Sequence, residues 1–295
     1  MTRAADALVV ATYGRRALVR RADGRRWQAL LRGRTSEVAV GDRVGVSEAA
    51  ADQLVIETVA ERSTLIERSV EHRRKLLAAN VDQALVLIGP APRFAEDILL
   101  RVMLAARHAN VKLLIVANKA DHPSFAAIEP RLAVLRALAE RVLVASVRDQ
   151  PESSREILLH ALRGHRTVLM GESGMGKSSL LNLLVPGAAQ RVGEISEALG
   201  SGRHTTTTSC LFEIDGHDDD WIIDTPGFQQ FGLAHLSSSE RDHAFIDIAP
   251  ALGGCRFHNC RHDREPGCAV RAAVQAGEID PLRHRLFLAL RDAPA

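Results

Sequence analysis

The stretch TVLMGESGMGKSSLLNLL at residues 167–184 decides the fold of the chain. A short apolar run leads into Gly171-x-x-x-x-Gly176-Lys177-Ser178, and a helical pattern follows it directly. Glycines at this spacing let backbone N–H groups turn towards phosphate oxygens, and the next helix adds the positive end of its dipole. A chance glycine-rich loop is a poor alternative in this setting. The stretch therefore predicts a nucleotide-binding loop in an α/β domain.

The side chains of this loop have distinct expected roles. Lys177 should reach the β- and γ-phosphates, and we count it among the catalytic residues. The Ser178 hydroxyl should ligate Mg²⁺. The expected nucleotide contacts are Gly171, Glu172, Ser173, Gly174, Met175, Gly176, Lys177, Ser178 and Ser179.

A second motif, earlier in the chain, should read the base. The apolar run VKLLIVA (111–117) ends in NKAD (118–121). A carboxylate at Asp121 can accept two hydrogen bonds from guanine, which adenine cannot offer in that arrangement. Lys119 should lie along the base, and Asn118 should tie this loop to the phosphate loop. The motif therefore predicts GTP and GDP as ligands.

A third motif should hold the metal and sense the γ-phosphate. The run WIID ends in DTPG (224–227), where Asp224 should hold Mg²⁺ through water and the Gly227 amide should contact the γ-phosphate as a catalytic group. The segment GSGRHTTTT (200–208) lies where a first switch belongs, and a Thr hydroxyl there should complete the Mg²⁺ coordination. The favoured candidates are Thr205 and Thr206.

Two weaker candidates belong to the same site. His204 would orient water or stabilise charge, although a lone histidine in such a segment is more often simply exposed. Ser146 ends the run RVLVAS (141–146), where a base-contacting loop belongs, but a plain strand end explains it equally well.

The order of the motifs is rotated. Short apolar runs at 81–89, 111–118, 141–146 and 167–171 alternate with helical patterns at 94–108, 128–139, 154–163 and 177–184, as in a parallel sheet covered on both faces. NKAD precedes the phosphate loop, whereas ordinary GTPases place it last. A circular permutation keeps such a sheet and moves only the chain ends.

The region before this domain differs in pattern and charge. Residues 1–72 hold short apolar runs separated by turn signals such as Asp23-Gly24, which predicts a small β-barrel. The whole chain has a net charge of only +2, yet residues 1–75 carry 15 Arg and Lys against 10 acids. A basic segment suits RNA, while an ordinary solvated face of an arginine-rich chain is the alternative.

The last part of the chain, residues 233–295, holds a cysteine cluster and two expected helices. Its spacing is Cys255-x4-Cys260-x-His262-x5-Cys268, which fits a closed tetrahedral site for one structural Zn²⁺. In a reducing cytoplasm such cysteines are more often metal ligands than disulfides. His258 is a competing donor, and a chance cluster is the alternative.

Composition places the chain among soluble cytoplasmic proteins. Its hydrophobic fraction of 46% and charged fraction of 25% are ordinary, and no apolar run approaches the roughly 18 residues that span a membrane. We expect no membrane partner, no signal peptide and a monomer.

Together these motifs resemble the small-subunit-dependent ribosomal GTPases of the RsgA/YjeQ type over nearly the whole chain. The resemblance implies an OB-fold at 1–72 that binds RNA, a circularly permuted GTPase domain at 73–232, and a mainly helical zinc domain at 233–295. It also implies a role in late maturation of the small ribosomal subunit, with rRNA binding and particle-stimulated GTP hydrolysis. The matching stretches are VGDRV (40–44), GESGMGKSSLLN (171–182), GRHTTT (202–207), DTPGFQQFGL (224–233) and CRFHNCRHDREPGC (255–268).

The residue after DTPG bears on the expected rate within that resemblance. Phe228 lies there, where many GTPases place a catalytic Gln, so slow turnover is expected until a partner completes the site. Met175 departs from the smaller aliphatic residue that is usual in the family.

Two other classes stay open from the sequence. A P-loop ATPase or kinase is disfavoured by Asp121. An RNA-binding module with OB and zinc domains and a largely regulatory nucleotide pocket is disfavoured by the intact Lys177, Ser178 and Asp224.

Overall fold

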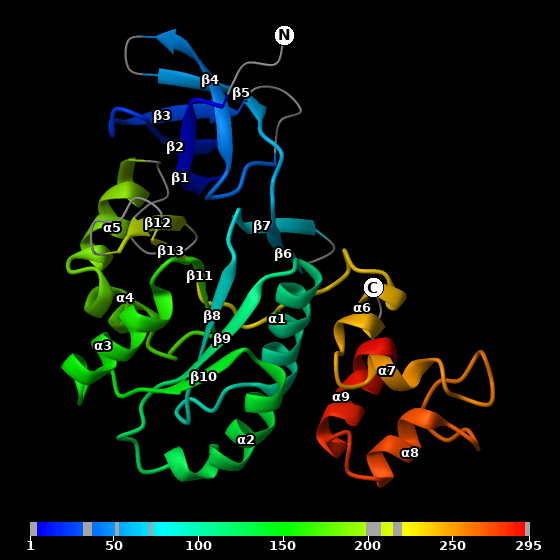
Figure 1. The fold of residues 1–295 in the computed structure, drawn as a ribbon. Helices are drawn as coiled ribbons and strands as arrows, with labels where there is room; N and C mark the ends of the chain where they lie inside the picture. Colours follow the sequence, from blue (N-terminus) through cyan, green and yellow to red (C-terminus); the bar gives the residue numbers. More distant parts are fainter. Residues whose placement is uncertain are drawn as a thin grey trace.

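A computed structural model of the 295-residue chain describes residues 5–31, 37–50, 53–70, 73–198, 208–214 and 220–292. It consists of a β-barrel, an α/β domain and a helical tail, which lies beside the α/β domain on the side away from α5 (Figure 1). This architecture confirms the expected fold class.

The barrel closes from five strands around an aliphatic core. Its order is β1-β2-β3-β5-β4, and β4 pairs back onto β1. The turn at Gly24, with φ of +80°, joins β2 to β3 as the Asp23-Gly24 signal predicted. Val19 and Ile56 are among its fully buried residues. The strands are β1 (Ala7–Tyr13), β2 (Arg16–Arg21), β3 (Arg26–Leu31), β4 (Arg43–Ala50) and β5 (Gln53–Val59).

The α/β domain has a parallel sheet with one antiparallel edge strand. Its order is β10-β9-β8-β11-β13-β12, and only β12 runs antiparallel to its neighbour β13. Every residue of β8 is buried, as expected for a strand covered on both faces. The strands are β8 (Gln83–Ile88), β9 (Lys112–Ala117), β10 (Arg141–Val144), β11 (Arg166–Met170), β12 (Ser209–Glu213) and β13 (Trp221–Asp224).

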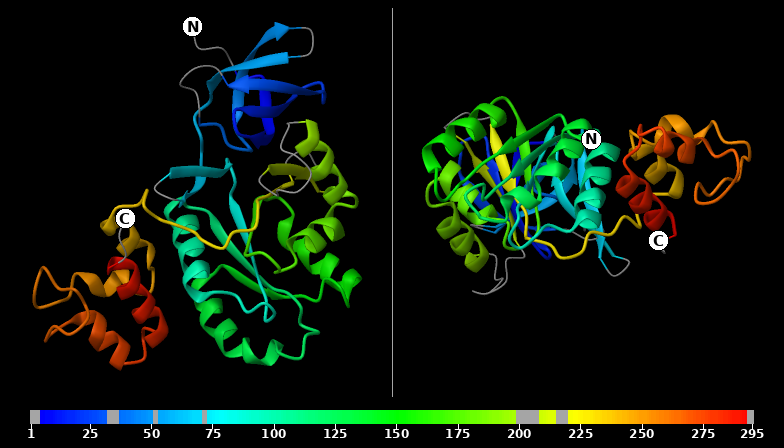
Figure 2. Two further views of the ribbon diagram at one scale, coloured as in Figure 1. Left: turned by 180° about the vertical axis from the view of Figure 1, so that it is seen from behind. Right: turned by 90° about the horizontal axis from the view of Figure 1, so that it is seen from below.

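The helices that cover this sheet lie on both faces. Figures 1 and 2 show α1 and α2 on one face and α3, α4 and α5 on the other. The sequence did not predict the helix α5, because no motif marks it. The helices are α1 (Glu96–His108), the 3-10 turn η1 (Phe125–Ala127), α2 (Glu129–Leu138), α3 (Pro151–Leu162), α4 (Lys177–Leu184) and α5 (Ala188–Ala198).

The barrel and the α/β domain share one continuous sheet. Strand β1 pairs with the edge strand β12, with Ala11 opposite Cys210 and Thr12 opposite Ser209. Cys210 is fully buried there, in keeping with its expected core position, and burial raises the pKa of its thiol to about 12. A separate hairpin of β6 (Leu65–Val70) and β7 (Arg73–Ala79) connects the two parts along the chain.

This hairpin also contacts the segment that follows β13. Ser69 and Gly232 exchange backbone hydrogen bonds of 2.9 and 3.1 Å. The Arg68 guanidinium donates to the Gln230 carbonyl at 2.7 Å. The segment that follows β13 and leads into the tail is therefore hydrogen-bonded to the β6–β7 hairpin, which follows the barrel in the chain.

The tail has its own small core. Its first helix, α6 (Ser238–Ala244), packs against α1 of the α/β domain. Phe245 and Phe287 meet edge to face with ring centroids 5.1 Å apart, and Arg283 pairs with Asp247 at 2.6 Å. Two helices are expected from the sequence, whereas the described tail has four, because three of them are too short to display helical periodicity. They are α6 (Ser238–Ala244), α7 (Ala249–Leu252), α8 (Ala269–Gln275) and α9 (Pro281–Asp292).

Within the described parts of the chain, no helix combines the length and apolar character needed to cross a membrane.

Candidate functional site

Three of the predicted motifs meet at one edge of the sheet. The NKAD motif follows β9, the phosphate loop follows β11 and DTPG follows β13. These strands are parallel, so their carboxyl ends lie on the same side, where open α/β sheets bind ligands. The rotated order of the motifs along the chain therefore leaves one common site.

The phosphate loop is shaped by close backbone approaches. Gly176 has φ of +99°, and a Cβ there would lie 2.6 Å from the Asn118 amide nitrogen. Gly227 comes equally near from the other side, because a Cβ there would lie 2.8 Å from both the Lys177 amine and the Ser173 hydroxyl. A side chain at Gly176 would displace the Asn118 amide, and one at Gly227 would displace the Lys177 amine and the Ser173 hydroxyl.

Lys177 lies inside this loop, at the start of α4. Its amine donates to the carbonyls of Gly171 and Glu172 at 2.7 and 2.9 Å. Burial lowers its pKa, and the nearby carboxylates of Asp224 and Glu172 oppose that shift. A desolvated ammonium enclosed by a glycine loop fits a phosphate group, because charge-assisted hydrogen bonds are strong there.

Asn118 connects three loops through one buried side chain. Its amide nitrogen donates to the Met175 carbonyl at 3.0 Å, and its amide oxygen accepts from the Val147 N–H at 3.2 Å. The neighbouring Lys119 donates from its amine to the carbonyls of Gly174, at 2.8 Å, and Ala91. The expected tie between NKAD and the phosphate loop is thus present as direct contacts.

Asp121 and Ser146 face each other across the end of the sheet. The Ser146 hydroxyl donates to the Asp121 carboxylate, and this hydrogen bond is the main reason that the pKa of Asp121 lies below its usual value. An ionised carboxylate is the form that accepts the N–H donors of a guanine edge.

A cavity of about 520 Å³ opens between these motifs. It has room for a base, and four of its residues are absent from the sequence-predicted set: Ala91, His122, Val147 and Arg148. Two of them could have been found by their position, since His122 follows Asp121 and Arg148 lies two residues after Ser146. The full lining is Ala91, Asn118, Lys119, Asp121, His122, Val147, Arg148, Gly174, Gly176 and Ser179.

Two of the expected Mg²⁺ ligands, Ser178 and Asp224, lie at or next to the phosphate loop. Burial raises the pKa of Asp224 to about 6, although the Lys177 charge lowers it in part. Ser178 is the second residue of α4, directly after Lys177. His204, Thr205 and Thr206 lie outside the described residues.

Phe228 is part of the core instead of facing the cavity. It is 3% exposed, meets Phe231 edge to face at 5.2 Å and has the Arg68 guanidinium 5.6 Å from its ring centroid. Its backbone bridges to Glu172, whose carboxylate accepts the Ala95 N–H at 2.7 Å. An apolar, buried side chain here cannot orient water.

The four expected metal ligands of the tail converge. All four ligand atoms, from Cys255, Cys260, His262 and Cys268, lie within 4.8 Å of one another. The thiols of Cys255 and Cys268 are 3.9 Å apart, and His262 Nδ1 lies 3.4 and 3.6 Å from them. Tetrahedral Zn²⁺ with bonds of about 2.3 Å to sulfur and 2.0–2.1 Å to nitrogen would space sulfurs about 3.8 Å apart and sulfur and nitrogen about 3.5 Å apart.

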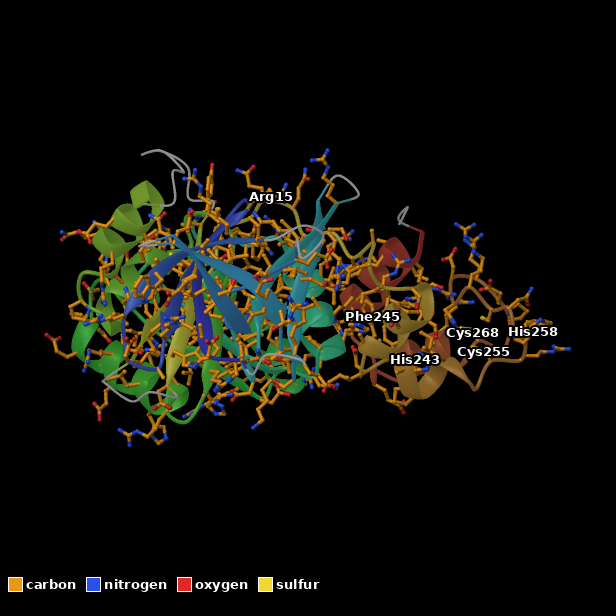
Figure 3. The ribbon with its side chains drawn as sticks, turned by 90° about the horizontal axis from the view of Figure 1, so that it is seen from above. Arg15, His243, Phe245, Cys255, His258 and Cys268 are labelled. Atoms are coloured by element: carbon orange, nitrogen blue, oxygen red, sulfur yellow. The ribbon has the colours of Figure 1, made fainter. Side chains whose placement is uncertain are left out.

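The surroundings of the cluster also suit a metal. The Cys268 thiol accepts the Arg271 N–H at 3.5 Å, and the His262 carbonyl lies 2.8 Å from the His284 ring. His258 is exposed and does not belong to the group of converging ligands. Figure 3 shows Cys255 and Cys268 close together within the tail. The donor set therefore fits a metal ion.

Comparison with known proteins agrees with this geometry. The RsgA GTPase family matches residues 59–234, more than half of the chain. A relative from Burkholderia pseudomallei (strain K96243), named small ribosomal subunit biogenesis GTPase RsgA, is 46% identical over 97% of this chain and 91% of its own length. A relative of the same name from Ralstonia nicotianae is 45% identical over 96% of this chain and 90% of its own length.

Solved structures show the same fold. YjeQ from Thermotoga maritima superposes with a TM-score of 0.67 at 26% identity, over 97% of this chain and 96% of that one. YloQ, described as a circularly permuted GTPase, has a TM-score of 0.67 at 22% identity, over 97% and 93% of the two chains. The chain therefore belongs to the RsgA GTPase family and is an enzyme that hydrolyses GTP.

Proposed function

We propose that this GTPase acts in late maturation of the small ribosomal subunit, where it binds rRNA and hydrolyses GTP faster on the particle. The observation that carries the proposal is the cavity lined by NKAD and the phosphate loop, with Gly227 of DTPG close to Lys177 and Ser173 of that loop. Relatives matched over at least 90% of their own length are named for biogenesis of that subunit. We further propose that it works as a monomer in the cytoplasm.

The proposed nucleotide contacts follow from the loops. Asp121, with Ser146 beside it, would accept hydrogen bonds from guanine, while Lys119 would lie along the base. Lys177 would exchange its two carbonyl partners for phosphate oxygens, since its amine already lies inside the loop. The remaining contacts would come from the backbone of residues 171–179 and the Asn118 side chain.

The proposed metal ligands are the Ser178 hydroxyl and the buried Asp224 carboxylate, completed by Thr205 or Thr206. Bound Mg²⁺ would neutralise charge that develops on the phosphates. Gly227 would approach the γ-phosphate through its N–H group, because no side chain separates it from Lys177. His204 is the proposed group for orienting water.

The proposed dependence on the particle rests on Phe228. Since its side chain is held in the core, the position after DTPG supplies no group to orient water, and free enzyme should be slow. Positioning supplied by a partner can raise GTP turnover by several orders of magnitude.

The proposed RNA-binding surface of the barrel is arginine-rich. Arg15 and Arg16 are exposed at the β1–β2 turn, and Figure 3 shows Arg15 at the edge of the molecule. The Arg20 guanidinium forms an ion pair with Glu213, and the Arg21 guanidinium forms one with Glu48. Phosphate contacts by such arginines would release counterions and make binding sensitive to salt.

The tail would hold one Zn²⁺ through Cys255, Cys260, His262 and Cys268. Such a closed set stabilises a fold and leaves no open position for a substrate.

Asp121→Asn should weaken GTP binding by at least roughly tenfold and shift preference towards xanthine nucleotides, because the exchanged donor and acceptor match xanthine. Asp149→Asn, at an exposed position in the neighbouring loop, is the control. Competition titrations with GTP, XTP and ATP measure the effect. Unchanged GTP selectivity in Asp121→Asn would remove Asp121 from the base-reading role.

Binding of Mg²⁺–GTP should weaken as the pH falls through about 6, because the raised pKa of Asp224 lets a proton compete with Mg²⁺ below that value. With a pKa near 6, the carboxylate alone accounts for a loss of roughly fourfold at pH 5.5 relative to pH 7.5. Asp224→Asn should bind Mg²⁺–GTP weakly and should lack the fourfold loss that comes from the carboxylate. Its pH profile therefore measures the part of the loss that is due to titration of GTP itself. Equal pH profiles for the two proteins would contradict the assignment.

The purified protein should contain one Zn²⁺ per chain, and Cys268→Ser should lose it and open the tail to proteases, because structural zinc contributes folding free energy. Cys210→Ala changes a buried cysteine outside the cluster and should keep the metal. Elemental analysis and limited proteolysis provide the measurements. Full zinc retention in Cys268→Ser would show that the cluster does not bind it.

Small ribosomal subunits should stimulate GTP turnover strongly, and the stimulation should fall steeply as salt rises. Arg15→Gln together with Arg16→Gln should lower the slope of log affinity against log salt by about 0.7–0.9 for each phosphate that is no longer neutralised. Arg136→Gln with Arg141→Gln removes equal charge from exposed positions on the α/β domain and serves as the control. Turnover that is equal with and without particles would favour an RNA-binding module with a regulatory pocket.

A further inference from the structure

The loop between Cys255 and Cys268 lies at the outer end of the tail (Figures 1 and 2) and carries Phe257. The Phe257 side chain is 41% exposed, whereas six other phenylalanines are at most 3% exposed. The other large exposed hydrophobic residues in the described parts of the chain are aliphatic: Leu30, Val144, Ile157 and Ile246. A single exposed apolar side chain is common, so the groups around the Phe257 ring decide whether it marks a contact surface.

The backbone around Phe257 is fixed on both sides. The Phe257 carbonyl accepts the Cys260 N–H at 3.2 Å, and the Arg256 N–H donates to the Gly267 carbonyl at 3.0 Å. Gly267 has φ of +72°, and a Cβ there would lie 3.0 Å from the Arg256 side chain. The ring is therefore presented by a loop anchored next to two metal ligands.

Glu265 holds the other side of the loop, at residues 261–264, through hydrogen bonds. Its carboxylate accepts the backbone N–H groups of Arg261, Asp263 and Arg264 at 3.0, 3.2 and 3.1 Å. The backbone N–H of Glu265 itself, followed by those of Arg261, Arg264 and Asp263, lowers the pKa of the Glu265 carboxyl to about 2. Glu265 is therefore ionised with its oxygens turned to the loop backbone, and the loop carries three arginines against two acids.

The side chains around the ring are basic or polar. Arg256, His258, Asn259, Arg261 and Arg264 are all exposed, and the Arg256 guanidinium lies 5.5 Å from the Phe257 ring centroid. The remaining acid, Asp263, lies 3.3 Å from Arg264. The ring is therefore surrounded by cations and hydrogen-bonding groups and does not belong to a wider apolar patch.

We infer that this loop is a stacking platform for an unpaired RNA base, with Phe257 against the base and the neighbouring arginines on the flanking phosphates. An isolated ring among arginines matches RNA, in which a flat base adjoins phosphates. A protein partner or a membrane would instead favour a contiguous apolar surface. The inference rests on the proposed function, because it takes the RNA to be that of the small ribosomal subunit.

The described residues of the barrel do not offer an equivalent platform. Trp27 is half-buried with the Arg21 guanidinium 5.7 Å from its ring centroid, and Tyr13 is also half-buried. Phosphate contacts would therefore dominate on the barrel, and base stacking would occur at the tail.

The test measures the affinity of the full chain, bound to a non-hydrolysable GTP analogue, for purified small ribosomal subunits at several salt concentrations. Phe257→Leu keeps an apolar side chain but removes the ring, and it should weaken binding about tenfold without changing the salt slope. Phe257→Trp should bind as tightly as wild type. Arg264→Gln should lower the salt slope by about 0.7. Ile157→Ala removes a similarly exposed apolar side chain on α3 and should leave affinity unchanged.

The identity of the contacted group follows from a photo-crosslink. With 4-azidophenylalanine at position 257, irradiation of the complex should join the chain to an unpaired rRNA nucleotide, mapped by a primer-extension stop. A crosslink to a ribosomal protein, or Phe257→Leu with wild-type affinity and full zinc content, would overturn the inference and leave the proposed function intact. Wild-type protein that neither binds the particle nor responds to it would overturn both.

Discussion

The buried amide of Asn118 determines the shape of the nucleotide site. It joins the loop after β9 to the Met175 carbonyl and to the Val147 N–H, so three loops from distant parts of the chain share one side chain. Leaving either buried partner without a hydrogen bond would cost about 1–3 kcal/mol. The same amide also requires glycine at position 176, because a Cβ there would occupy the space of the Asn118 amide.

Because the order of the motifs is rotated, the nucleotide site is connected directly to the tail and to the barrel. Strand β13 carries Asp224 and then leads through Phe228 and Gly232 into the tail, while Ser69 of the β6–β7 hairpin binds Gly232 on the way. On the other side, β12 pairs with β1 of the barrel. Both flanking domains are thus hydrogen-bonded to strands or segments that border the nucleotide loops.

Much of this could be predicted from the sequence, because the decisive signals are local. Apolar runs with helical patterns between them predicted the parallel sheet, and the Asp23-Gly24 turn predicted the β2–β3 hairpin. The cysteine spacing predicted the convergence of Cys255, Cys260, His262 and Cys268. What could not be predicted depends on tertiary contacts: the β1–β12 pairing, the contact of Ser69 with Gly232, and the burial of Phe228. Phe257 lies within the cysteine stretch but is not one of its ligands, and its exposure is apparent only in the fold.

The central claim is that three segments separated in the chain form one pocket for guanine nucleotides. Hydrogen–deuterium exchange of the full chain with a non-hydrolysable GTP analogue tests it most directly. The account predicts that residues 118–121, 171–179 and 224–228 gain protection together, and that an ATP analogue at the same concentration protects none of them. Protection confined to residues 171–179, or equal protection by both nucleotides, would contradict it.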